Sequence, residues 1–234
     1  MRRIQILLAL TLAISVSLNL FAVPTAFAAP PADVTNDQPV IQFPNTITFR
    51  AKITANAKIT SVVLEYGTEQ LTCGDVIAKA FPEFSPGTSI DTQWTWDMRQ
   101  SGSLPPGATI WWRWRYIDES GKESISDQKS ITWLDDTHPW QTLTGGKLRL
   151  HYYDIRKSEA QGMLNAGLEG LKHNETNAGL VVDDPIDVYV YPSYEDMRNS
   201  ILYESSWAGG LALPEHNIVL MGVSGFDPKW DQNT

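Results

Sequence analysis

The chain has 234 residues, a formal net charge of −9 from 27 acidic and 18 basic side chains, and a single cysteine. An acidic chain without a basic patch is a poor partner for phosphate backbones, which argues against a nucleic-acid ligand. Cys73 has no second cysteine with which to form a disulfide in the chain, so a hydrophobic core must stabilise the fold.

The first 28 residues have the pattern of a secretory signal peptide. Arg2 and Arg3 precede an apolar run over residues 4–21, and alanines at 26 and 28 form an A-x-A cleavage site. We therefore expect export to the cell envelope or the extracellular space and cleavage after Ala28. The mature chain then has a net charge of about −11 and no membrane span. The alternative is that the apolar run stays in place as an uncleaved membrane anchor.

Residues 29–39 are predicted to be a linker, and residues 40–134 alternate apolar and polar side chains as β-strands do. Turn signals lie at residues 105–107 and 118–121. Short strands separated by regular turns predict an all-β sandwich of immunoglobulin or fibronectin III type. The apolar positions of its strands are Ile47, Phe49, Ala51 and Ile53; Trp94, Trp96 and Met98; Ile110, Trp112, Trp114 and Tyr116; and Ile131 and Trp133.

After a predicted linker at residues 135–146, residues 147–234 show a different pattern. Ser158 and Gln161 have the spacing of a capping box at the start of a helix, and Ser193 is placed to cap a second, shorter helix. The order β-α-β-α-β predicts an α/β (α+β) domain, which we expect to be incomplete because two helices cannot cover both faces of its sheet. The predicted strands are 147–153, 185–191 and 217–221, the short helix is 194–203, and Ala160, Leu164, Leu168 and Leu171 share one face of the longer helix.

The sequence contains none of the common catalytic, nucleotide-binding or zinc-binding motifs. An H-E-x-x-H zinc site needs two histidines four residues apart on one helical face, but the histidines stand at 138, 151, 173 and 216. We expect all four to be structural or solvent-facing, with His173 at the end of a helix, where its partial charge suits the dipole. The sequence also has no G-x-S-x-G, P-loop or G-x-G-x-x-G motif. No catalytic residue and no metal ligand is assigned.

One segment is a candidate binding element. Residues 207–214 carry paired glycines just before the predicted strand at 218–221. Glycines beside a strand allow a second backbone to approach closely. The alternative is a plain flexible loop.

In this order, these features resemble the start of the peptidase MA-like (gluzincin) zinc metallopeptidases, which occur in bacterial exported proteins. The resemblance implies a metallopeptidase-like α/β domain, a peptide or protein substrate, and zinc as the cofactor of the full-length protein. It rests on the strand at 148–153, the helix through Leu164 and Leu168, the strands at 186–191 and 218–221, the segment 207–212, the Trp-Arg-Trp-Arg run at 112–115 and the motif from Asp135 to Trp140.

Carried onto this sequence, the resemblance assigns substrate binding to Gly209, Gly210, Leu211 and Ala212. In such enzymes an edge strand beside the metal holds an extended peptide by main-chain hydrogen bonds. The H-E-x-x-H helix of the family follows the last of these strands, and no such motif occurs before Thr234. We therefore expect this chain to be the N-terminal part of an exported zinc metallopeptidase. By itself it should be inactive and should bind no cofactor.

Two other functions fit the sequence. The first is a non-enzymatic cell-envelope module that binds peptide or glycan through the sandwich. The second is a surface-sugar reader that uses Trp111. Against the second, tryptophans at alternate positions are typical of a sandwich core, which would leave Trp111 stacked on Arg113 or Arg115 at the surface.

Overall fold

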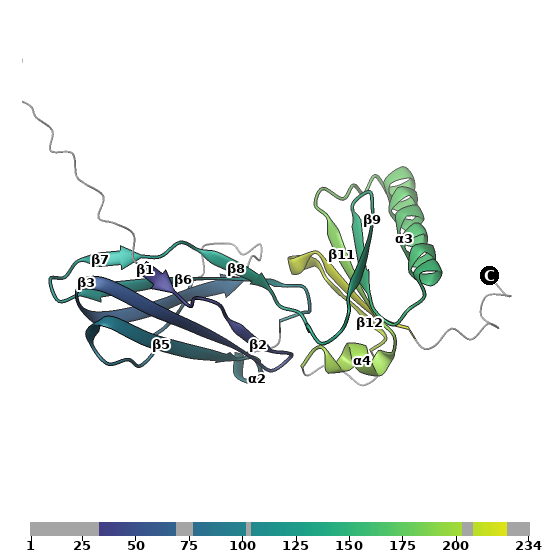
Figure 1. Cartoon of the computed structure of the whole chain (residues 1–234). Helices are drawn as coiled ribbons and strands as arrows, with labels where there is room; N and C mark the ends of the chain where they lie inside the picture. Colours follow the sequence, from purple (N-terminus) through teal and green to yellow (C-terminus); the bar gives the residue numbers. More distant parts are fainter. Residues whose placement is uncertain (1–32, 69–76, 102–103, 203–207, 224–234) are drawn as a thin grey trace, which may run out of the picture. The chain divides into compact units, whose positions relative to one another are not determined.

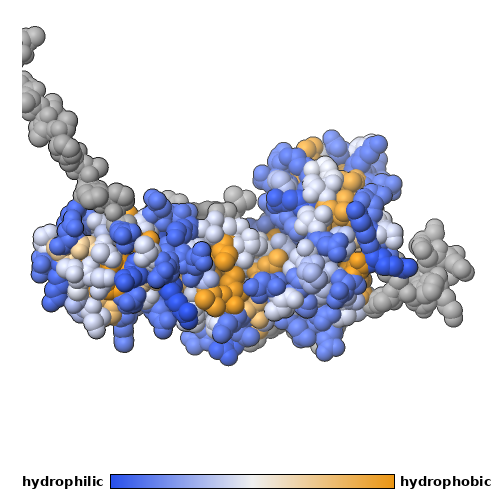
Figure 2. Space-filling view, in the orientation of Figure 1, coloured by the Kyte–Doolittle hydropathy of each residue, from blue (hydrophilic) through white to orange (hydrophobic). Residues whose placement is uncertain are grey.

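The computed structural model describes residues 33–68, 77–101, 104–202 and 208–223, so the predicted signal peptide and Cys73 lie outside the described residues. The described residues form an eight-stranded sheet followed by a five-stranded sheet (Figure 1). Hydrophilic side chains cover most of the face seen in Figure 2, between smaller apolar patches. No helix in these ranges is long and apolar enough to cross a membrane.

The eight-stranded sheet is organised by one long strand, β3 (Thr46–Thr68). Its first half pairs with β5 (Gly87–Asp97) and its second half with β6 (Thr109–Asp118), both antiparallel, with a register shift between the halves. Both halves contribute side chains to one core, an arrangement compatible with the predicted sandwich of two packed layers. The other elements are β1 (Asp33–Thr35), β2 (Val40–Gln42), β4 (Ala78–Ala80), α2 (Met98–Ser101), β7 (Glu123–Ile125) and β8 (Lys129–Thr132).

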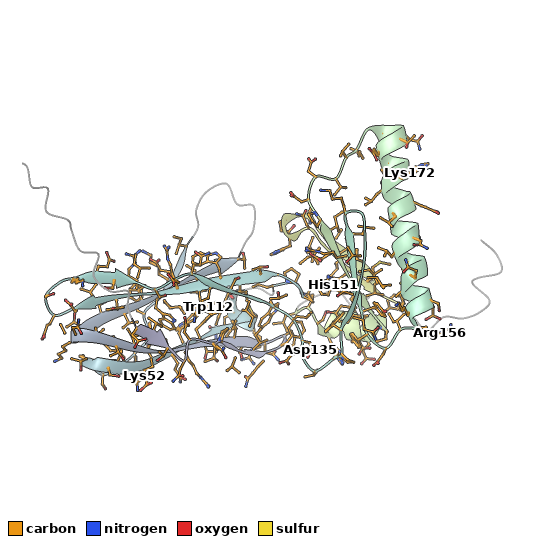
Figure 3. The ribbon with its side chains drawn as sticks, turned by 45° about the horizontal axis from the view of Figure 1, so that its top comes forward. Lys52, Trp112, Asp135, His151, Arg156 and Lys172 are labelled. Carbon is orange, nitrogen blue, oxygen red and sulfur yellow. The ribbon has the colours of Figure 1, made fainter. Side chains whose placement is uncertain are left out.

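The core of this first domain follows the predicted alternation. Every second side chain in the first half of β3, from Ile47 to Ile53, is buried, and the polar residues between them face outward. The same holds in β6, where Trp112 and Trp114 point inward and are almost fully buried. The interior that they fill is visible around Trp112 in Figure 3.

The predicted turns of the sandwich are also confirmed. Gly107 has a φ of 90° and Gly121 a φ of 82°, values that glycine adopts without steric cost. In the hairpin between β6 and β7, Asp118 Oδ1 accepts hydrogen bonds from the backbone N–H groups of Ser120 and Lys122. An aspartate that bonds to the backbone just after it is a common device for starting a turn.

The five-stranded sheet has the strand order β12-β13-β11-β10-β9. The three central strands are parallel to one another, and the two outer strands run antiparallel to their neighbours. Its elements are β9 (Gln141–Gly145), β10 (Leu148–Tyr152), α3 (Lys157–Ala178), β11 (Ile186–Tyr191), α4 (Tyr194–Asn199), β12 (Gly210–Leu213), the 3-10 helix η1 (Pro214–His216) and β13 (Ile218–Gly222).

The two helices pack on opposite faces of this sheet. Helix α3 lies against β9 and β10, with Ala160 and Leu164 buried as their shared helical face predicts. Helix α4 lies against β11 and β13, where it buries Met197. Ser193 caps α4 as predicted, since its side chain accepts a hydrogen bond from the backbone N–H of Asp196.

Three features of the longer helix and its neighbours differ from the sequence-based expectations. The capping-box prediction at Ser158 is wrong, because α3 begins at Lys157 with Arg156 as a cap that makes no side-chain cap bond. Its end is not at His173 either, because Gly179 supplies the left-handed residue that stops the helix. Helix α4 stops at Asn199, earlier than the predicted range.

Two segments predicted as linkers contain strands. Residues 141–145, placed in the linker 135–146, form the edge strand β9, and residues 33–35, placed in the linker 29–39, form β1. Both strands are short; β9 pairs with the equally short β10, and β1 pairs with the long β3. Too few residues alternate in them for a period of two to be recognised in the sequence.

Candidate functional site

The segment with paired glycines forms an edge strand of the second sheet. Residues 210–213 make up β12, which pairs antiparallel with β13 through the register Leu211↔Leu220 and Leu213↔Ile218. The backbone N–H of Gly222 bonds to the carbonyl oxygen of Gly209 at 3.1 Å. Hydrogen-bonded pairs alternate along an antiparallel ladder, so residues 209, 211 and 213 bond to β13. The backbone groups of Gly210 and Ala212 therefore point away from the sheet.

The glycines bring β12 close to its neighbours. A Cβ atom at Gly210 would lie 3.1 Å from the carbonyl oxygen of Leu220, and one at Gly209 would lie 3.3 Å from the ring of Tyr194. The close approach expected from paired glycines is thus present, and residues 210–213 are a strand rather than a plain loop. Trp207, the first residue of the predicted segment, lies outside the described residues.

The side chains of β12 divide between the two faces of the sheet. Leu211 and Leu213 pack against the apolar cluster on the α4 face, which anchors the strand. Gly210 and Ala212 are exposed and carry little or no side chain. An incoming strand would therefore meet backbone groups without having to displace a large side chain. The structure brings Gly209, Gly210, Leu211 and Ala212 together at this edge, and their role in substrate binding remains a prediction.

A polar cluster on the α4 face of the sheet was not predicted. Asp187 in β11 accepts hydrogen bonds from Arg149 and from His151 in β10, at 2.5 and 2.8 Å, and the other ring nitrogen of His151 lies 3.0 Å from the hydroxyl of Thr142. The imidazole also stacks on Tyr189, with ring centroids 4.5 Å apart. Figure 3 marks His151 in this sheet. The sequence pattern that could have predicted this cluster is the strand alternation, which puts residues 149 and 151 on one face of their strand and residues 187 and 189 on one face of theirs.

Hydrogen bonds keep Asp187 ionised. Burial opposes the charge, but the bonds from His151 and Arg149 outweigh that cost, so the pKa of the carboxyl lies below its usual value. The histidine is held on one side by the carboxylate and on the other by Thr142. All four polar groups are thus used in mutual contacts, which fits the structural role expected for His151.

The motif from Asp135 to Trp140 folds onto the same sheet. Trp140 makes edge-on contacts with Tyr153 and Tyr191, and its Nε1 donates to the carbonyl oxygen of Asp135 at 2.9 Å. His138 stacks on Tyr153, with centroids 4.1 Å apart, and lies 3.3 Å from the Asp135 carboxylate. Burial raises the pKa of Tyr153 and of Tyr191 well above the usual phenol value, so both stay neutral and serve packing.

Zinc does not fit the described residues. They contain no group of three or more histidine, cysteine, aspartate or glutamate side chains placed to hold a metal ion. His138 and His151 each pair with a single carboxylate, while His173 lies beside Asn177 near the end of α3. Burial lowers the pKa of the remaining histidine, His216 in η1. The described residues therefore offer no metal centre.

Comparisons with known proteins support the resemblance drawn from the sequence. Residues 166–234 match the family model of the Peptidase MA superfamily, a range that includes most of α3 and all of β11, α4, β12 and β13. No curated protein matches the chain. The chain is also similar to a solved structure described as the Br derivative of BhCBM56, with 8% identity, a TM-score of 0.27, and coverage of 43% of this chain and 88% of that one. A TM-score this low carries no argument about fold or ligand.

Proposed function

We propose that this chain is part of an exported zinc metallopeptidase and that β12 holds the peptide substrate in an extended conformation. Two observations support the proposal. Residues 166–234 match the Peptidase MA superfamily, and strand β12 in this range, which begins at the second of the paired glycines, lies at the sheet edge. We also propose that the sandwich that precedes this domain in the sequence is of immunoglobulin or fibronectin III type.

The outward backbone of Gly210 and Ala212 is the observation that carries the proposal. A peptide running beside β12, about 4.8 Å away, would pair with the N–H and C=O groups of both residues. These main-chain bonds recognise any extended peptide, because they do not depend on its side chains. Leu211 and Leu213 anchor the strand by packing on the α4 face of the sheet, so the outward backbone groups are positioned before a substrate binds.

The metal ligands of the proposed enzyme are not among the described residues. The four histidines of the sequence are all described and form no metal cluster. Zinc bound elsewhere in the full-length enzyme would supply a Lewis acid, and the residues described in this chain would only bind and orient the peptide. The chain alone is accordingly expected to hydrolyse no peptide.

The sheet also offers a surface against which more of a peptidase domain would pack. Helix α3 lies against β9 and β10, at one end of its face. At the other end of that face, Met221 of β13 is 38% exposed, although most of its strand is buried. Within the described ranges no helix covers Met221. A further helix at this end would bury an apolar side chain that now meets solvent.

The experiment uses the full-length product of the gene, with fluorescein-labelled casein as substrate. Zinc content near one ion per molecule and hydrolysis of casein are expected. An enzyme without zinc or without hydrolysis would overturn the proposal. Mass spectrometry of the protein secreted by its host tests export, because cleavage after Ala28 predicts a chain that begins at Ala29.

Ala212→Pro tests the edge strand itself. Proline removes the outward N–H at this position without removing a bond to β13, and edge strands tolerate that change. Loss of one hydrogen bond to the peptide is expected to raise KM about threefold to tenfold, with little change in melting temperature. Ala212→Ser, which keeps the N–H, is the matched control. Equal KM values for the two variants would remove β12 from the binding site.

A further inference from the structure

Three aromatic and cationic side chains form a strip on the outer surface of the sandwich. In β6 the buried tryptophans 112 and 114 alternate with Trp111, Arg113 and Arg115, which face outward and are partly exposed. Neighbours in β3 and β8 complete the surface, since Trp111 is paired with Gly67 on one side and with Ser130 on the other. The strip therefore lies on a sheet face, where the flanking strands already use the backbone groups of β6.

The indole of Trp111 lies over Gly67 of β3. A Cβ atom at Gly67 would be 2.9 Å from Nε1, 3.0 Å from Cε2 and 3.0 Å from Cζ2 of the indole. A point almost equally far from these three atoms lies above the ring plane and just outside the edge that carries Nε1 and Cζ2, so the indole covers Gly67 with this edge. A side chain at position 67 would have to displace the indole. Trp111 thus lies over Gly67 rather than in the expected stack on Arg113 or Arg115.

A buried carboxylate fixes the two arginines beside the indole. The side chain of Glu65 is only 1% exposed and accepts from Nε of Arg113 at 2.7 Å and from Nε of Arg115 at 3.0 Å. Burial disfavours the charge of Glu65, but the bonds from Arg115 and Arg113 outweigh it and lower its pKa. The guanidinium groups therefore stay in place, and the arginine side chains are still 28% and 24% exposed.

From this geometry we infer that the outer face of the sandwich binds a saccharide, with one sugar ring stacked on Trp111 and its hydroxyl groups bonded to Arg113. The face of an indole carries negative charge density, which attracts the C–H groups on the flat side of a pyranose ring. Arg113 follows two residues later on the same face, about 7 Å along the strand. A donor at that distance reaches the hydroxyl groups at the rim of the stacked ring or those of the next sugar.

The position of the strip favours a saccharide over other partners. A peptide that adds a strand needs a free sheet edge, whereas Trp111 lies on a face between β3 and β8. Nucleic acid would require a surplus of cations, and the chain carries a net charge of −9. This inference concerns the sandwich only. It is independent of the proposed peptidase role and can hold or fail without it.

The test titrates the mature chain with cellohexaose, chitohexaose and laminarihexaose and follows binding by calorimetry and tryptophan fluorescence. At least one of these probes is expected to bind, and Trp111→Ala is expected to weaken its affinity at least about tenfold. Gly67→Ala, which lifts the indole, is expected to weaken binding as well. Phe81→Ala is the control, because Phe81 is 73% exposed and lies outside the strip.

Each alternative result has a definite meaning. If none of the three oligosaccharides binds the wild-type chain, or if Trp111→Ala binds as well as the wild type, the inference is wrong. Trp111 then serves only to cover Gly67, a structural role known for aromatic residues beside glycine in sheets. If Trp111→Ala fails to fold, Trp111→Phe decides, because a smaller ring that keeps the stack is expected to retain weakened binding.

Discussion

Nε2 of His151 lies 2.8 Å from Oδ1 of Asp187, on neighbouring parallel strands of the second sheet. An ionised carboxylate can only accept hydrogen bonds, so Nε2 carries the proton and donates. In the neutral ring Nδ1 is then left to accept from the hydroxyl of Thr142, 3.0 Å away. A single tautomer of the histidine thus satisfies both contacts and links β9, β10 and β11 through their side chains.

Asp187→Asn is expected to lower the free energy of unfolding by about 1.5–3 kcal/mol at neutral pH, because two hydrogen bonds to a charged acceptor are weakened. The pKa of Asp187 is lower in the folded protein than its ordinary value of 3.8. Its stabilisation is therefore fully present above about pH 4 and is lost as the pH falls through the folded-state pKa.

Urea unfolding of the wild type and of Asp187→Asn, at neutral pH and at about pH 2.5, checks this prediction. The difference between the two proteins should shrink at the lower pH. Asp184→Asn, a change at an exposed carboxylate in the loop before β11, is the matched control and should have little effect. A difference for Asp187→Asn that is the same at both pH values would show that its charge does not stabilise the fold.

Gly222→Ala is expected to destabilise the second domain by about 1–3 kcal/mol, as overpacking of a tight contact does. A Cβ atom at Gly222 would lie 2.7 Å from Cα of Tyr194 and 2.9 Å from the carbonyl oxygen of Ser193. Both are backbone atoms at the start of α4, which cannot move away without shifting the helix.

Gly170→Ala is the counterpart of this change. Gly170 lies inside α3, and a Cβ atom there meets nothing within 4 Å. Alanine is the better helix former, so the variant should gain about 0.5–1 kcal/mol. Thermal unfolding of both variants measures the two opposite shifts. Similar shifts for the two variants would refute the close packing of α4 on β13.

Ser193→Ala is expected to cost about 1 kcal/mol, because the Ser193 hydroxyl accepts the hydrogen bond of the Asp196 N–H at the start of α4. Ser158→Ala should change stability little, since Ser158 lies inside α3 and alanine has the higher helix propensity. Chemical unfolding of the two variants separates these cases. A larger loss for Ser158→Ala would restore the capping box predicted from the sequence.

The contrast between these two serines indicates what the sequence can predict. Both serines precede a helix-forming segment and have a partner three residues on, so local pattern alone does not distinguish them. At Ser193 the residue before the helix is extended, with φ −146° and ψ 160°, and the cap forms. At the longer helix the chain becomes helical two residues earlier, after β10, and Arg156 takes the cap position. The path of the chain from β10 into α3, rather than the local motif, determines which residue caps the helix.

The same distinction applies to the fold and the candidate site. Alternation over long strands predicted the buried face of β3 and β6, because every second residue there meets one core. Register is a relation between strands that are far apart in sequence. The alignment of Glu65 with Arg113 and the approach of Asp187 to His151 therefore could not be read from pattern. The glycines at 209 and 210 did indicate a close backbone approach, and pairing with β13 placed it at an edge.

Asp37, on the loop that connects β1 and β2, places its side chain inside the sandwich. Its carboxylate is buried, and Oδ1 accepts from Nε1 of Trp112 at 2.8 Å and from Nε1 of Trp114 at 2.9 Å. Lys129 donates to the backbone oxygen of Asp37 at 3.1 Å and lies 3.0 Å from Oδ2, an ionic contact without hydrogen-bond geometry. One side chain from the loop thus satisfies two indole N–H groups inside the sandwich.

Asp37→Ala leaves both indole donors unpaired in the core, and we expect a loss of about 2–4 kcal/mol in the free energy of unfolding. Asp37→Asn keeps an oxygen that can accept from the indoles, so it should lose less, and Lys129→Met should lose least because both indole bonds remain. Urea unfolding followed by tryptophan fluorescence ranks the three variants. If Lys129→Met costs as much as Asp37→Ala, the ion pair rather than the indole bonds holds the loop.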